Sequence, residues 1–240
     1  KFGNPKKHAM PFTYLGIVHE RLSPCHVFLH QQPYLSKLKP AISDREVARV
    51  SDGTALTAVE HKEFRSLLCS LLWVCQTRID LAHDVVGLQS EMVTPRVEHF
   101  KSVNGLLKRA WNSMTMNGLH FRVLEFPLRI VSSADCGHAT KKSCYPYGGK
   151  LVAIMEDKTR SIEEYEWMSA EDRRFLEGFA HPIYFSARKA TRISHSTSHA
   201  ETLSAVGCTQ TTQLVSHRFT EVFAQTLLCK QHCTPTDLLH

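Results

Sequence analysis

The sequence predicts a mixed chain of the α+β to α/β class, in which a β-hairpin and a helical bundle precede a mixed sheet with helices. Between residues 57 and 111, apolar residues recur at steps of three and four, which is typical of amphipathic helices. A Ser/Thr-rich segment near the end of the chain leads into a long helical pattern from Ser198. We place a domain boundary near Pro127 and expect two regions, 1–126 and 127–240. Short apolar runs predict three strands in the second region, at 128–131, 150–155 and 182–187.

The bulk composition is that of a protein with real hydrophobic cores, since the chain has 240 residues and 42% apolar content. It has no long charge-free apolar run and no signal peptide, so we expect no membrane partner and an intracellular location. The first residue is Lys rather than Met, which predicts an excised or truncated segment. Eight cysteines lack a framework spacing and are expected to be reduced thiols, with Cys69 and Cys75 in the core.

The net charge of +6 is unevenly distributed along the chain. Residues 1–130 contain 17 Lys and Arg against 11 Asp and Glu, whereas residues 131–240 contain 12 of each kind. A basic half beside a neutral half with clustered acids is consistent with a nucleic-acid clamp that feeds a metal site. The alternative is a mildly basic protein whose charges only solvate its surface.

The N-terminal segment predicts a hairpin. Residues 12–18 form a candidate strand in which Gly16 permits close backbone approach, and residues 26–30 form its partner across a turn at Ser23-Pro24. Two further elements are expected before the bundle, a short helix at 31–38 and a long loop at 39–57.

Three amphipathic helices with short connections predict the bundle. Thr57-Ala-Val-Glu60 matches a capping box at the start of the first helix. Asp80 is a candidate cap for the second helix, and Thr94-Pro95 supplies a candidate cap and first-turn proline for the third. Basic residues on the outer faces would hold nucleic-acid phosphates, although such residues commonly serve only solvation. These candidates are Lys62, Arg65, Arg96, Lys101, Lys108 and Arg109.

Two acids are the candidate catalytic and metal-binding residues. Asp135 follows the apolar run at 128–131, and Glu201 lies where the long helix begins. One carboxylate at a strand end and another in a helix's first turn can share a divalent cation pair, with the ions about 4 Å apart. Each acid also has a structural alternative, because Ser198-His-Ala-Glu201 is a capping-box match and Asp135 can be a turn residue. His138 could contact substrate phosphate or be a turn histidine without a role.

Several short motifs occur along the chain in a fixed order. They are Tyr14-Leu-Gly-Ile17, Gln32-Pro-Tyr-Leu-Ser-Lys37, Phe64-Arg-Ser-Leu-Leu68, Gln76-Thr-Arg-Ile-Asp-Leu81 and Ser198-His-Ala-Glu201. In order and spacing, these motifs resemble the Pol polyprotein of copia-type LTR retrotransposons. The resemblance covers nearly the whole chain, with the reverse transcriptase C-terminus (thumb and connection) first and an RNase H domain second. It implies a thumb-like bundle and an RNase H-like mixed sheet.

The resemblance implies a ribonuclease that removes the RNA strand of an RNA–DNA hybrid. Its cofactors would be two Mg²⁺ or Mn²⁺ ions, with Asp135 and Glu201 among the ligands. Its partners would be the hybrid or another nucleic acid and the remainder of the polyprotein, namely palm, fingers and integrase. The location would be a cytoplasmic particle or the nucleus.

The chain departs from the family at several positions. No Asp-Asp pair of the polymerase signature occurs, and the family's Asp-Ala-Asp turn is replaced by Asp135-Cys-Gly-His138. Of the later RNase H carboxylates only Asp237 is left, so we expect an RNase H domain that is incomplete at its C-terminus. The alternative function is therefore a non-catalytic, degenerate or truncated relic that binds nucleic acid.

Other features carry weaker expectations. His195 and His199 lack a third zinc ligand at a suitable spacing, as does Cys229-Lys-Gln-His-Cys233. Residues 156–180 hold eight acids against four bases and are expected to form a solvated insertion rather than a partner surface. Residues 119–126 are either a strand that pairs with 128–131 or a linker.

Overall fold

The computed structural model describes residues 9–137, 147–157, 180–189 and 196–232, and it shows a mixed α+β chain with two antiparallel sheets. The chain divides into two compact units. The first unit comprises Lys1–Val123 with Ser186–Thr191, and the second comprises Leu124–Phe185 with Arg192–His240. The prediction of a mixed α+β class is therefore confirmed. The predicted insertion lies almost entirely outside the described residues, as do His138, His195 and Asp237.

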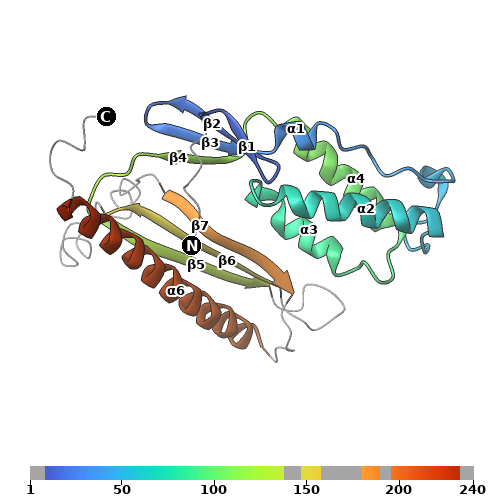
Figure 1. The fold of residues 1–240 in the computed structure, drawn as a ribbon. Coiled ribbons are helices and arrows are strands. Elements are labelled where there is room, and N and C mark those ends of the chain that lie inside the picture. Colours follow the sequence, from blue (N-terminus) through green and yellow to red (C-terminus); the bar gives the residue numbers. More distant parts are fainter. Residues whose placement is uncertain (1–8, 138–146, 158–179, 190–195, 233–240) are drawn as a thin grey trace, which may run out of the picture. The chain divides into compact units, whose positions relative to one another are not determined.

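The first unit contains a four-stranded antiparallel sheet in the order β1-β2-β3-β4 (Figure 1). Its strands are β1 Phe12–Tyr14, β2 Ile17–Ser23, β3 His26–His30 and β4 Leu119–Arg122. The single strand predicted at 12–18 is wrong, because a turn at Leu15-Gly16 separates β1 from β2. The backbone φ angles there are 47° for Leu15 and 74° for Gly16, the left-handed values that a two-residue hairpin turn requires.

Strand β4 decides between the two predictions for residues 119–126. Leu119–Arg122 is a strand, but it pairs with β3 and not with the segment at 128–131. Phe28 pairs with His120, and its ring occupies the space beside Gly118. A Cβ atom on Gly118 would lie 2.4 Å from that ring and 2.7 Å from the Leu29 carbonyl oxygen, so only glycine allows this approach.

The helical bundle of the first unit packs around one apolar core. The core is formed by side chains such as Phe64, Leu71, Val85 and Leu107, none of which has any exposed surface. Burial of such a cluster is the dominant stabilising contribution in a helical unit. Its elements are α1 Gln32–Leu35, the short 3₁₀ helices Val47–Arg49 and Ile79–Leu81, α2 Ala58–Val74, α3 Ala82–Gln89 and α4 Val97–Asn112.

The capping box predicted at the start of α2 is confirmed. The Thr57 Oγ1 atom accepts a hydrogen bond from the Glu60 amide at 3.1 Å, and the Glu60 carboxylate accepts one from the Thr57 amide at 2.9 Å. Two amides at the helix N-terminus, which lack intrahelical partners, are thereby satisfied.

The starts predicted for the other two helices are wrong. Helix α3 begins at Ala82 without a side-chain cap, because the Asp80 carboxylate binds the Arg78 guanidinium instead. Helix α4 begins at Val97, two residues after the proline that was expected to open it. The backbone carbonyls of Thr54 and Asp52 accept hydrogen bonds from the amides of Val97 and Glu98, at 3.0 and 3.1 Å. A loop distant in sequence thus caps this helix.

The second sheet has the order β5-β6-β7, and helix α6 packs on β5 and β6 (Figure 1). Each strand includes the predicted apolar run and extends beyond it, and in β5 the pairing with β6 continues through the polar residues Ser132 and Ser133. The elements are β5 Leu128–Gly137, β6 Tyr147–Glu156, β7 Ala180–Lys189 and α6 Thr197–His232.

Helix α6 is continuous through Gly207 and turns small side chains toward the sheet. Ala200, Ser204 and Cys208 are buried, and such small side chains allow the helix backbone to approach the strands closely. Four larger apolar residues of the helix are exposed, namely Leu203, Val206, Leu214 and Val222.

Candidate functional site

Asp135 lies within β5, paired with Gly149, and not at the end of a strand as predicted. Its side chain is exposed, whereas that of the next residue, Cys136, is buried. A Cβ atom on Gly148 would contact both Ser204 Oγ of α6 and Cys136 Sγ, which shows that Cys136 faces α6. Because successive strand residues point to opposite faces, the Asp135 side chain projects from the other face of the sheet. Its carboxylate accepts a hydrogen bond from the Cys136 amide at 2.8 Å.

Glu201 is the fifth residue of α6 and therefore lies beyond the first turn. The helix starts at Thr197, and Ser196 Oγ accepts the hydrogen bond from the His199 amide at 3.1 Å. Ser196 is the cap, so the predicted capping box of Ser198 and Glu201 is wrong. The exposed Glu201 side chain is thus not engaged in capping this helix.

Both acids act on the thiol of Cys136. Burial raises the pKa of this thiol, and the negative charges of Asp135 and Glu201 raise it further. The strand and helix are joined next to it, where Ser204 Oγ donates a hydrogen bond of 3.4 Å to the Asp135 carbonyl oxygen. The pKa of the Cys136 thiol, at the junction of β5 and α6, is therefore affected by both carboxylates, although Asp135 belongs to the sheet and Glu201 to the helix.

The fit of this pair to magnesium is partial. Mg²⁺ is commonly bound through one or two carboxylates together with substrate phosphates, and two exposed carboxylates meet that minimum. Within the described ranges, however, no three His, Cys, Asp or Glu side chains are grouped so as to hold a metal ion.

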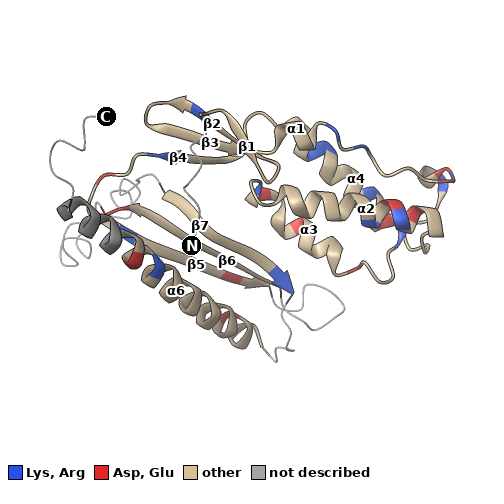
Figure 2. Cartoon of the chain, viewed as in Figure 1, with Lys and Arg blue, Asp and Glu red and all other residues tan. Residues whose placement is uncertain are grey.

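The six predicted phosphate-binding residues are all exposed, on α2, on α4 or at the residue before α4. Acidic positions are interspersed with them along these helices (Figure 2). Two of the six have acidic partners, since the Lys101 ammonium contacts the Asp52 carboxylate at 2.8 Å and Arg109 pairs with Asp84. Those two charges are partly neutralised by the protein itself. The other candidates are Lys62, Arg65, Arg96 and Lys108.

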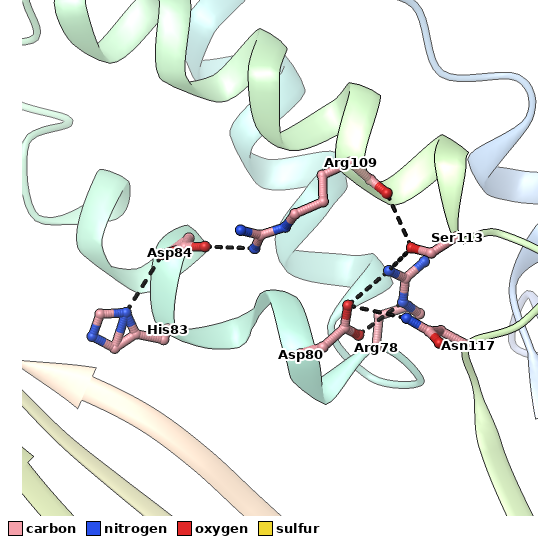
Figure 3. Close-up of polar contacts among 7 residues, drawn as sticks. All are labelled: Arg78, Asp80, His83, Asp84, Arg109, Ser113 and Asn117. Carbon is pink, nitrogen blue, oxygen red and sulfur yellow. Dashed lines mark hydrogen bonds and ion pairs between the residues drawn. The ribbon is translucent and has the colours of Figure 1, made fainter.

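A buried arginine network, which sequence reasoning did not predict, closes the bundle near the end of α4 (Figure 3). Arg78 is only 3% exposed, and its guanidinium donates to both oxygens of Asp80, to the Ala110 carbonyl and to Ser113 Oγ. Burial raises the pKa of Asp80, but hydrogen bonds and charge from Arg78 lower it on balance. The Thr77-Arg-Ile-Asp80 motif follows α2, and the hydrogen bonds of Arg78 therefore connect the segment after that helix to the end of α4. In the sequence, only the spacing of Arg78 and Asp80, two residues apart, indicated this network.

A second network surrounds Glu60, which has no exposed surface. Its carboxylate accepts hydrogen bonds from Arg45 Nε at 2.9 Å, Arg45 Nη2 at 2.8 Å and Ser43 Oγ at 2.6 Å. Burial opposes ionisation of this group, but these partners and the Thr57 amide lower its pKa from 4.5 to about 2. The capping box pointed to Glu60, but Arg45 lies in a loop whose position the sequence did not reveal.

The described cysteines carry free thiols. Cys75 is buried as predicted, and burial raises its pKa to about 12. Cys69 is exposed on α2, so its predicted core position is wrong.

Comparisons with known proteins found no matching family, no significantly similar curated protein and no significantly similar solved structure. Among the described residues, none of the helices is both long and apolar enough to cross a membrane.

Proposed function

We propose that this chain is part of a copia-type retrotransposon reverse transcriptase and RNase H, and that its second unit contributes to cleavage of the RNA strand of RNA–DNA hybrids. The observation that carries the proposal is the order of three strands followed by a helix, with one acid on the first strand and another near the helix start. Both acids influence the same thiol at the junction of β5 and α6.

The chemistry of the two carboxylates fits a hard divalent cation. Mg²⁺ or Mn²⁺ would supply activation of water and stabilisation of charge on the phosphate. Asp135 or Glu201 would provide a carboxylate ligand for such an ion, and exposed bases of α2 and α4 would hold the phosphates of the duplex. The hybrid would be the substrate, and the palm, the fingers and the integrase of an intracellular polyprotein would be partners.

The test is cleavage of a labelled RNA–DNA hybrid with Mg²⁺ or Mn²⁺, with wild type beside Asp135→Asn and Glu201→Gln. Loss of activity in both variants supports the proposal, and Glu221→Gln, which changes an acid farther along α6, serves as the control. Activity that survives in both variants would place the reaction elsewhere or in a contaminant.

A second candidate function is a non-catalytic nucleic-acid-binding relic. It is favoured by the position of Asp135, which projects from the sheet face opposite α6. The absence of a three-ligand group within the described ranges points the same way. In the same assay, the relic would bind the hybrid in a salt-sensitive manner and cleave nothing above background.

A further inference from the structure

Two histidines are hydrogen-bonded to each other across the edge of the four-stranded sheet. His26 lies on β3 and His120 on β4, and the distance from His26 Nε2 to His120 Nδ1 is 2.9 Å. The His120 ring also stacks on Phe28, with centroids 4.3 Å apart and an interplanar angle of 17°. Strand β4 has four residues and pairs with β3 at the edge of the sheet, so these ring contacts add to a short run of backbone pairing.

The distance between the two ring nitrogens fits one hydrogen bond, in which one imidazole donates its N–H group and the other accepts. Each neutral imidazole has one donor and one acceptor nitrogen, so the neutral pair can form this bond in either direction.

We propose that the His26–His120 pair is a pH-sensitive latch that holds β4 on the sheet and releases it when both imidazoles are protonated. One added proton is tolerated, because a protonated imidazole can still donate a hydrogen bond to its partner while that partner is neutral. A second proton leaves two donors facing each other with like charges, and the bond is lost.

The charges around the pair also oppose double protonation. Arg122 of β4 lies directly opposite His26, and no acid occupies the corresponding position of β2, where Ser23 pairs with His26. The acid on the same face is Glu20, which lies opposite Phe28 and contacts His30 at 3.4 Å. Burial and the charges of His26 and Arg122 lower the pKa of His120.

Release of β4 would change the first sheet at one edge. Strand β4 lies next to β3 at the end of the order β1-β2-β3-β4, so its detachment exposes the edge of β3. Unpaired backbone groups at such an edge can pair with another strand. The latch would thus make this edge available at acidic pH, independently of any catalytic role of the second unit.

The test is amide hydrogen exchange in the full chain, corrected for the intrinsic pH dependence of exchange, across the histidine range of about pH 5 to 8. We expect the protection of residues 119–122 to fall by roughly tenfold at the acidic end, while the α2 amides stay protected. His120→Gln and His26→Gln cannot take up the protons and should make the protection of β4 independent of pH. His83→Gln, which changes an exposed histidine of α3, should behave as wild type.

Unchanged β4 protection in wild type, or an equal fall in the two glutamine variants, would overturn the proposal. Should the variants fail to fold, ¹⁵N spectra of the wild-type imidazoles give an independent answer. A coupled pair takes up its protons in two separated steps. Two independent titrations, each with a single ordinary midpoint, would contradict the latch.

Discussion

Glu60 is a buried acidic side chain of the helical bundle, and its lowered pKa keeps it ionised without contact with solvent. Its carboxylate joins the loop that contains Ser43 and Arg45 to the start of α2, where Thr57 is the cap. A buried charge of this kind is tolerated only while all its partners are present. Replacement of one carboxylate oxygen of Glu60 should therefore lower the free energy of unfolding markedly.

We predict that Glu60→Gln lowers the free energy of unfolding by roughly 2–4 kcal/mol, because it leaves the Arg45 charge uncompensated and weakens the cap. Urea denaturation followed by circular dichroism measures the effect. Glu63→Gln, on the same helix but outside this network, should change stability by less than about 0.5 kcal/mol. Equal effects of the two substitutions would show that the network is not stabilising.

The same residue predicts a pH dependence. The pKa of Glu60 is lowered to about 2 in the folded protein, so the unfolded chain binds a proton at higher pH than the folded one does. Its contribution is therefore complete above the unfolded pKa of 4.5 and is lost as the pH falls toward about 2. The stability difference between wild type and Glu60→Gln should shrink over that window. A constant difference would mean that the carboxylate is not preferentially ionised in the fold.

At the scale of elements, two glycines are expected to behave in opposite ways. A Cβ on Gly207 would approach Lys150 Nζ, which is the far end of a flexible side chain and can move aside. Gly207→Ala should therefore stabilise α6 by up to about 1 kcal/mol through helix propensity. Gly118→Ala would meet the Phe28 ring and a backbone oxygen, so it should destabilise the first unit by roughly 1–3 kcal/mol. Thermal denaturation distinguishes the signs, and destabilisation by both substitutions would refute the account of Gly207.

The hairpin turn between β1 and β2 offers a stabilising change. Leu15 has φ of 47°, a left-handed conformation that costs a leucine roughly 1–2 kcal/mol. Leu15→Asn should raise the free energy of unfolding by about 0.5–1 kcal/mol, because Asn-Gly is the favoured pair in such turns. Leu22→Asn, at an exposed position of β2, controls for loss of apolar surface and should not stabilise. Chemical denaturation of both variants decides the matter.

Local patterns in the sequence predicted those elements whose signals lie within a few residues. The α2 capping box is such a case, since Thr57 and Glu60 satisfy each other within one turn. Helix α4 was predicted, but its first residue was not, because its first amides bond to Thr54 and Asp52, which the loop brings back from some forty residues earlier. Non-local pairing also decided the place of β4 beside β3. Hydrogen bonds of this kind join residues that are distant in the sequence, so no periodic pattern predicts them.

The candidate site shows the same limit. The acids Asp135 and Glu201 could be selected from their neighbours in the sequence, but the face to which each points could not. That face depends on the register of β5 with β6 and on Ser196 capping α6 two residues before the expected start. A shift of one residue in a strand moves every side chain to the other face.

For the chain as a whole, the proposed hybrid binding makes the distribution of charge testable. Each basic residue that contacts phosphate releases counterions, so the logarithm of the binding constant should fall linearly with the logarithm of salt concentration. Lys62→Gln and Lys108→Gln should each reduce that slope by about 1 if the residue contacts phosphate. Lys101→Gln should change it much less, because the Lys101 ammonium is already held by Asp52 at 2.8 Å.

Fluorescence anisotropy with a labelled hybrid across a salt series measures the slope for wild type and the three variants. Identical slopes would show that α2 and α4 only present solvated charges, and a full effect of Lys101→Gln would show that its pairing with Asp52 gives way to the nucleic acid.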